Sequence, residues 1–312
     1  MRIVLSTLAL LTASPAWAEP PQVVVDTPVT ASLVSMVMGD LGQAQILLPQ
    51  GASAHHHQMR PSDAQGLQRA DLLIWTGPEL TPWLDRAAGS VAGNAAQLRL
   101  LDVPGTHLRG YGVKGEGRHS HDDHAQEARH DHGHAHQDGS VDPHAWLDPG
   151  NAPVWLEAIA ATLANADPGN ADTYGANAAA AAARLRDVEA DLQQRLAPHR
   201  DATFVVFHDA YGYFTDHFGL KPALAISLGD ASTPSAARLA EIRSQIAATD
   251  ARCAFPEYGS DAMLVQTVVE GMPVRIGAEL APEGSSKDAG ADLYVALLTG
   301  LTNALDDCLS QE

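Results

Sequence analysis

Short apolar runs alternate with longer amphipathic segments along most of this chain. In the first third, the runs QVVVDT, QILLP, DLLIWTG and LRLLDV lie within residues 22–103. Helix-like segments separate them near Pro28–Asp40, Pro61–Ala70 and Pro78–Ala88. Strands that alternate with helices usually pair in parallel and are buried on both faces. The pattern therefore predicts an α/β lobe with a mostly parallel sheet.

The same alternation returns in the last third of the chain. The runs TFVVFH, ALAISLG, RCAFPE and PVRIGAE lie within residues 203–279. Helix-like segments follow them at Ala210–Phe218, Thr233–Thr249, Ser260–Gly271 and Ala289–Leu309. We therefore expect a second α/β lobe of the same class, although neither half shows a clear sequence repeat of the other.

Between the two predicted lobes lies a long segment with high helix propensity. After a helix at Asn151–Ala166, Asp167 is a plausible N-cap, Pro168 suits a first turn, and no proline follows until Pro198. The Ala-rich interior favours one rigid helix of roughly 45 Å. We therefore divide the chain into an N-terminal lobe at residues 19–166, a linker helix at 167–198 and a C-terminal lobe at 199–312.

The N-terminus predicts export from the cytoplasm. Residues 1–18 combine one Arg, an apolar run and the ending Ala-Trp-Ala, which is typical of a secretory signal peptide cleaved after Ala18. The apolar run is too short to span a bilayer. Loss of its single Arg changes the formal charge from −19 to −20. So acidic a chain is a poor candidate for binding nucleic acid or anionic membranes, and we expect a soluble periplasmic protein.

The two cysteines of the chain fit this compartment. Disulfides persist in the periplasm, and an even number of cysteines in an exported chain favours pairing. We therefore predict one disulfide between Cys253 and Cys308. In the simple loop model it stabilises the fold by about 4 kcal/mol.

Three histidines occupy positions that suit a shared ligand site. His55 follows the strand QILLP, His208 ends the strand TFVVFH, and His144 lies in DPHAWLDP. Ligands of open α/β sheets bind at the carboxyl ends of strands, and three imidazoles suit zinc better than magnesium or calcium. A lone loop histidine is more often a surface residue, and His56 and His57 are equally placed by spacing.

A separate histidine cluster fills a long polar segment at residues 115–138. Such a segment builds no core, and His-rich tracts bind metal. Ordering a flexible chelate costs entropy, so we expect this loop to be a weaker, auxiliary zinc site. Its histidines are His119, His121, His124, His130, His132, His134 and His136.

These motifs resemble those of the zinc-binding periplasmic proteins that serve ABC importers. GASAHHHQMRPSD, DPHAWLDP and FHDAYGYFTDHFGL are similar to the three ligand regions of that family, in the same order. The resemblance covers essentially the whole mature chain and implies His55, His144 and His208 as ligands. It also implies a His-rich loop between the first two ligands. Manganese-type relatives carry a carboxylate at the position of His208. The imidazole in this chain therefore favours a softer metal.

The chain departs from the family pattern at two acidic positions. Ala281 in GAELAPEG stands where many members carry Asp, and Ala54 stands where some zinc members carry Glu. We expect a water molecule as the fourth zinc ligand, with Glu279, Glu283 or a loop histidine as alternatives.

The resemblance implies a non-enzymatic protein that captures Zn²⁺ as cargo and delivers it to an inner-membrane ABC permease. We expect it to act as a monomer, with a periplasmic zinc chaperone as a further candidate partner. The alternatives are a zinc metallohydrolase or hydratase and a stand-alone zinc chaperone. Three histidines plus water is a catalytic zinc geometry, but only Glu257 and Asp209 suggest themselves as a general base, and neither spacing is diagnostic.

Overall fold

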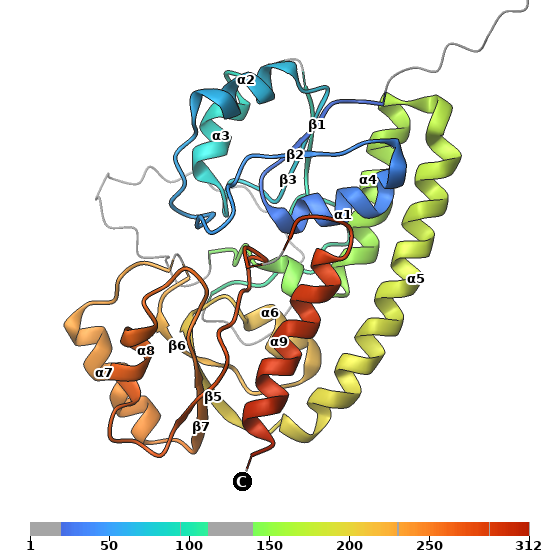
Figure 1. Ribbon diagram of the computed structural model, residues 1–312. Helices are drawn as coiled ribbons and strands as arrows, with labels where there is room; N and C mark the ends of the chain where they lie inside the picture. The colour runs from blue at the N-terminus through green and yellow to red at the C-terminus, as the bar shows by residue number, and fades with distance from the viewer. Residues whose placement is uncertain (1–19, 94, 112–139, 230, 287, 312) are drawn as a thin grey trace, which may run out of the picture.

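The computed structural model describes residues 20–93, 95–111, 140–229, 231–286 and 288–311. The predicted signal peptide and the seven loop histidines lie outside these ranges. The described chain forms two α/β lobes, one above the other in Figure 1, with a long helix along one side of both. This arrangement confirms the predicted fold class.

The first lobe contains a four-stranded sheet in the order β2-β1-β3-β4, and every pair is parallel. The strands are β1 (Val23–Val25), β2 (Gln45–Ile46), β3 (Leu72–Trp75) and β4 (Ala96–Arg99). Its helices are α1 (Pro28–Met38), α2 (Pro61–Arg69), α3 (Pro82–Ala88) and α4 (Asn151–Ala166). Residues Gly77–Thr81 form a turn, so α3 is shorter than the predicted Pro78–Ala88 segment.

The second lobe repeats this strand order, as β6-β5-β7-β8, again with parallel pairs. The strands are β5 (Thr203–His208), β6 (Leu224–Ser227), β7 (Ala251–Phe255) and β8 (Arg275–Ile276). Its helices are α6 (Gly212–Phe218), α7 (Ala236–Ala247), α8 (Ala262–Val269) and α9 (Leu293–Leu309). The two lobes therefore share one topology without a visible sequence repeat.

The central strands β1, β3 and β5 are almost entirely apolar because both of their faces are buried, whereas the edge strands β2, β4 and β8 carry polar residues and are partly exposed. On β1, Val24 packs with α2 and α3, while Val23 and Val25 face the opposite side. On β5, Val205 and Phe207 pack toward α7 and α8, and the residues between them face the centre of the molecule. Side chains alternate between faces along a strand, so each strand contributes to two cores.

One central core extends across both lobes. It includes Trp155 of α4, Tyr174 of the long helix, Phe204 of β5 and Tyr294 of α9. The long helix α5 (Ala171–Leu196) has 26 residues, or roughly 39 Å. Short 3₁₀ turns at Pro168–Asn170 and Ala197–His199 flank it. Figure 1 shows α5 running beside both lobes, and it packs against α1, α4 and α9.

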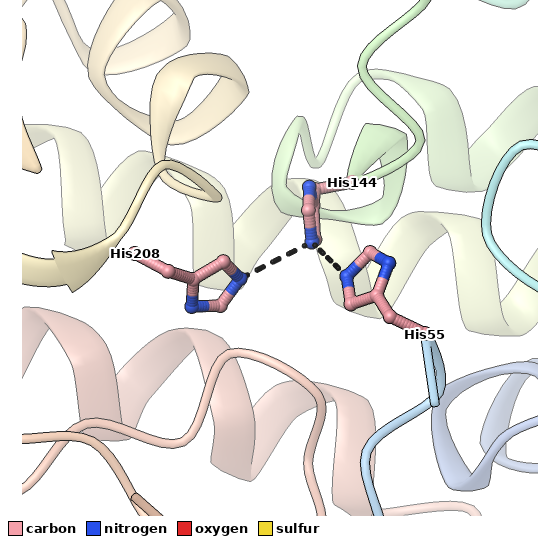
Figure 2. A group of neighbouring side chains, drawn as sticks. All are labelled: His55, His144 and His208. Atoms are coloured by element: carbon pink, nitrogen blue, oxygen red, sulfur yellow. Dashed lines mark hydrogen bonds between the residues drawn. The ribbon is translucent and has the colours of Figure 1, made fainter. Parts of the chain in front are cut away.

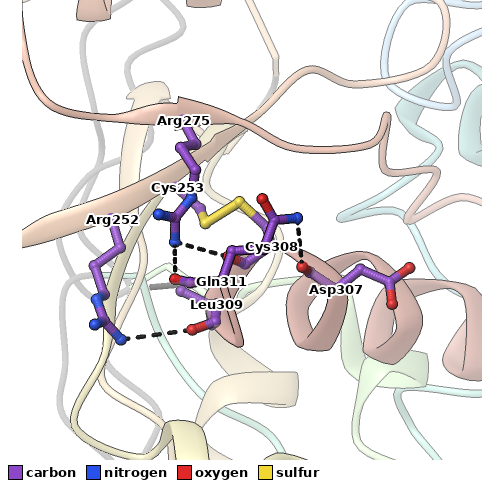
Figure 3. The surroundings of a disulfide bond; sticks show 7 residues. All are labelled: Arg252, Cys253, Arg275, Asp307, Cys308, Leu309 and Gln311. Atoms are coloured by element: carbon purple, nitrogen blue, oxygen red, sulfur yellow. Dashed lines mark hydrogen bonds between the residues drawn. A yellow bond between two sulfur atoms is a disulfide. The ribbon is translucent and has the colours of Figure 1, made fainter.

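The predicted disulfide is present and ties the C-terminal helix to the second sheet. Cys253 of β7 is bonded to Cys308 of α9, 55 residues later (Figure 3). The Arg275 side chain of β8 donates a 2.9 Å hydrogen bond to the carbonyl of Cys308. The bond and the arginine therefore hold the last turn of α9 against the edge of the sheet.

No helix within the described ranges is long and apolar enough to cross a membrane.

Candidate metal centre

The three histidines that the sequence singles out meet between the lobes. Figure 2 shows their Nε2 atoms turned toward one another. The Nε2 atom of His144 lies 3.3 Å from Nε2 of His55 and 3.4 Å from Nε2 of His208. Two imidazole nitrogens that share a tetrahedral zinc at 2.0–2.1 Å stand about 3.3–3.4 Å apart. The three ring nitrogens are therefore spaced to share one ion.

His144 is held by a carboxylate two residues before it. The side chain of Asp142 accepts hydrogen bonds from the backbone N–H of His144 at 3.0 Å and from its Nδ1 at 2.8 Å. Both residues are fully buried. Because Nδ1 donates its proton to the carboxylate, Nε2 presents a lone pair to the centre of the cluster.

His208 is oriented in the same way by a carboxylate on the neighbouring strand. It ends β5, which pairs with β7, and Glu257 follows β7 at the same edge of the sheet. Oε2 of Glu257 lies 2.7 Å from Nδ1 of His208 and accepts a second bond from the Tyr211 hydroxyl at 3.2 Å. Burial lowers the pKa of His208, but the nearby carboxylates, Glu257 foremost and then Glu283 and Asp209, together raise it above its usual value.

His55 reaches the cluster because the residue before it is fixed. The carbonyl of Ala54 accepts a 2.8 Å bond from Nε1 of Trp83, and its N–H donates a 3.2 Å bond to Glu283. The neighbouring rings point elsewhere. His56 lines an adjacent cavity, and His57 packs on Trp83 with ring centroids 4.8 Å apart. The fold thus identifies His55 as the ligand candidate among three neighbouring histidines that spacing alone could not distinguish.

The cluster contains imidazoles alone. Within the described ranges, His55, His144 and His208 form the one group of three or more His, Cys, Asp or Glu side chains with ligand atoms all within 4.8 Å of one another. Glu279 is exposed and lines a different depression beside α9. Glu283 is buried nearby. Burial and Glu257 raise its pKa to about 7, although His208 and the Ala54 amide act in the opposite direction.

Three other histidines of the described chain, His107, His199 and His217, form structural contacts outside the cluster. His199 bonds to Asp306 of α9 at 2.8 Å. His217 of α6 bonds to Asp148 at 2.7 Å and to Glu189 of α5 at 2.9 Å. Asp148 also holds the ring of His107, at 2.7 Å. These contacts join helices and loops to one another.

Four tryptophans of the described chain are buried, and two of them also shape the site. Trp75 and Trp155 lie in the apolar cores. Trp83 fixes the residue before His55, and Nε1 of Trp146 bonds to the carbonyl of Pro282 at 2.8 Å. The loop that carries Glu283 is thereby tied to the segment that carries His144.

The chain matches one protein family over most of its length. A family model described as zinc-uptake complex component A, periplasmic, or ZnuA, matches residues 23–308. The chain belongs to the ZnuA family. A Paracoccus denitrificans protein named high-affinity zinc uptake system protein ZnuA is 52% identical, over 99% of this chain and 98% of its own. A Brucella suis protein of the same name is 34% identical, over 93% and 92%. The family resemblance read from the three motifs is therefore confirmed.

Solved structures share the fold of this ZnuA family member. The periplasmic zinc-binding protein TroA of Treponema pallidum superposes with a TM-score of 0.78 at 20% identity, covering 94% of this chain and 100% of its own. A solved ZnuA gives 0.74 at 23% identity, covering 93% and 99%. A manganese-bound protein of Candidatus Liberibacter asiaticus also gives 0.74, at 20% identity, covering 93% and 99%. Proteins described with different metals share this architecture, so the fold alone does not identify the ion.

The two carboxylates behind the ligand histidines are what the sequence analysis missed. Asp142 was not considered, and Glu257 was considered only as a general base. Asp142 precedes His144 by two residues, a local signal in DPH that was available. Glu257 depends on the pairing of β5 with β7, which spacing along the chain does not reveal.

We predict that Glu257→Gln weakens zinc binding by about tenfold while leaving one tight site. A neutral amide is a poorer acceptor for the Nδ1 proton of His208, and loss of such outer partners typically costs 10–100-fold in metal affinity. Competition titration with a chromophoric chelator measures the change. Glu241→Gln on the exposed face of α7 is the matched control. Equal affinities for both variants would contradict the orienting role of Glu257.

Proposed function

We propose that this protein captures Zn²⁺ in the bacterial periplasm, between its two lobes, and delivers it to an inner-membrane ABC permease. The observation that carries the proposal is the spacing of three Nε2 atoms at His55, His144 and His208. Family membership and the predicted N-terminal signal peptide support the location and the transport role. The chemistry is ligand exchange on the ion, without bond-making in a substrate.

The donor set favours zinc over harder cations. Imidazole nitrogen suits zinc, whereas magnesium, calcium and manganese favour oxygen donors. With three protein ligands at the cluster, a water molecule completes the tetrahedron in our proposal. We further propose that the protein acts as a monomer and is not an enzyme, with a zinc chaperone as a candidate second partner.

Metal titration combined with a turnover assay tests the proposal. The purified mature chain should bind one equivalent of Zn²⁺ tightly and Mn²⁺ far more weakly. The zinc form should show no esterase or CO₂ hydration activity above that of free zinc. Tighter binding of Mn²⁺ would overturn the zinc assignment. Turnover that disappears on replacing Asp209 or Glu257 would overturn the capture function in favour of a hydrolase or hydratase. A permease and an ATPase encoded beside this chain would separate import from a stand-alone chaperone.

We also propose that the His-rich segment at residues 115–138 is an auxiliary zinc site. The described residues on either side of it pair beside the cluster, because the backbone N–H of Asp142 donates to the carbonyl of Arg109 at 2.9 Å and that of Tyr111 donates to the carbonyl of Ser140 at 3.0 Å. Histidines tethered this close to His144 have a high effective concentration for passing zinc inward.

We predict that deleting Gly115–Asp138 lowers the zinc stoichiometry while one tight site remains. The segment should contribute only weaker equivalents, because a flexible chelate loses ordering entropy on binding. Equilibrium dialysis with zinc analysis gives the stoichiometry, and chelator competition gives the tight constant. Loss of the tight site on deletion would show that the loop, and not the three-histidine cluster, holds the zinc.

A further inference from the structure

A cavity of about 450 Å³ opens between the lobes next to the histidine cluster. The first lobe contributes the segment Gly51–Ser53 and His56, and the second contributes the loops around Glu257 and Glu283. The three cluster histidines are not among the residues that line it. His144 and His208 are fully buried. An ion in this cavity is therefore still outside the three-nitrogen site.

Two buried carboxylates connect the cavity to the cluster. Glu257 and Glu283 both line the cavity, and they are only 6% and 9% exposed. Glu257 bonds directly to His208. Glu283 bonds to the amide of Ala54, the residue before His55, and lies close enough to His208 for a charge interaction. The two carboxylates therefore lie where an ion would pass from the cavity to the histidines.

These two carboxylates differ in how firmly they are held. Oε2 of Glu257 accepts bonds from the His208 ring at 2.7 Å and from the Tyr211 hydroxyl at 3.2 Å. Oε2 of Glu283 accepts one bond, from the neutral backbone N–H of Ala54 at 3.2 Å. Moving Glu257 would release a ligand histidine from its partner. Moving Glu283 breaks one neutral-donor hydrogen bond, which contributes about 1 kcal/mol.

The backbone that carries Glu283 is fixed while its side chain retains this freedom. The carbonyl of Pro282 is held by Trp146. Gly284 has a φ of +70°, and a Cβ at that position would lie 2.8 Å from Leu293 of α9, so the turn requires glycine. A carboxylate on a fixed turn next to a cavity can change its partner without movement of the lobes.

We propose that Glu283 is a transfer ligand, which binds Zn²⁺ as the ion leaves the cavity and passes it to the three histidines. The inference rests on the proposed function, because it assumes that the cluster is the zinc site. A carboxylate oxygen replaces one water of the hydrated ion, and the imidazoles then replace the carboxylate and all but one of the remaining waters. The same exchange runs in reverse when zinc is released.

A ligand that acts only during transfer changes rates without changing the equilibrium. Glu283 stabilises the partly dehydrated ion on its way in and on its way out. Its removal should therefore slow association and dissociation by the same factor, and Kd should stay nearly constant. A permanent fourth ligand behaves differently, since its removal speeds dissociation and weakens Kd.

Stopped-flow measurement on Glu283→Gln tests the proposal. The amide oxygen of glutamine still accepts the Ala54 bond, so the fold should be retained, and thermal unfolding checks this. We expect zinc association and dissociation each to slow by about tenfold, with Kd changed by less than about threefold. Glu279→Gln is the control, because Glu279 is exposed and lies outside the cavity. Glu283→Asp, which keeps the charge, should show rates between those of Gln and wild type.

Three results would overturn the proposal. The first is unchanged rates in Glu283→Gln. The second is faster dissociation and weaker Kd in Glu283→Gln, which would indicate a permanent ligand. The third is a Glu283→Asp variant that is as slow as Glu283→Gln. A wild-type chain without a tight zinc site would instead overturn the proposed function, and the wild-type titration separates these cases.

Discussion

Replacing His208 with alanine should weaken the tight zinc site by roughly a thousandfold. Zinc sites with several protein ligands bind with about 12 kcal/mol in apparent free energy, so the loss of one of three protein ligands costs about 4 kcal/mol. The ring is fully buried at the end of β5, and its Nε2 atom lies 3.4 Å from Nε2 of His144. Water that replaces it cannot reproduce a nitrogen donor already held in place by Glu257.

His217→Ala is the matched control for this experiment. His217 is also a histidine of the second lobe with carboxylates on both ring nitrogens, but its partners are Asp148 and Glu189, away from the cluster. Its loss should lower the free energy of unfolding and leave zinc affinity within about threefold, because it touches none of the three ligands. Chelator competition on both variants, with circular dichroism to confirm folding, gives the comparison. Wild-type affinity in His208→Ala would refute the ligand assignment.

The fold class could be predicted because both sheets are parallel and buried on two faces. Such strands are short continuous apolar runs, and all eight runs of this kind contain or overlap strands in the structure. The helix ends were less predictable. The Pro78–Ala88 segment begins as a turn, since the hydroxyl and N–H of Thr81 both bond back to the carbonyl of Gly77. That turn depends on local hydrogen bonds that apolar periodicity does not record.

The choice of ligand among His55, His56 and His57 required three-dimensional contacts. Adjacent residues in a loop send their rings in different directions, and spacing alone treats them equally. Here Trp83 and Glu283, from distant parts of the chain, fix both backbone groups of Ala54 and so direct His55 into the cluster. The family motif pointed to the same residue.

The carboxylates that bond to the ligand histidines, Asp142 and Glu257, show a second limit of sequence reasoning. A buried acidic residue at a strand end invites interpretation as a general base, as for Glu257. Its actual neighbour is set by the parallel pairing of β5 with β7, which brings residues 208 and 257 together across 49 positions. Asp209 was the other candidate base. Burial and the nearby Asp142 raise its pKa, while the charges of Arg109 and His208 act in the opposite direction.

Acidification should release zinc steeply, with a pH dependence set by the same carboxylates. Each ligand histidine must be neutral to bind the ion, so protons compete with zinc as pH falls. Because Glu257 raises the pKa of His208, the apo site keeps its first proton above the ordinary imidazole value of 6.5. Zinc affinity should therefore begin to fall near neutral pH, earlier than for unpaired histidines.

The slope of log Kd against pH depends on how many ligand histidines take up a proton when zinc leaves. Three protonated rings within a few ångströms repel one another, so their proton uptake spreads over several pH units. A plot of log Kd against pH should rise from a slope of about one near neutrality to two or more near pH 5, with an overall loss of about a thousandfold or more. In Glu257→Gln the onset should move to lower pH, because His208 no longer has an anionic partner. Chelator competition at fixed ionic strength measures both curves, and a slope that never exceeds one would mean that the three imidazoles do not share the ion.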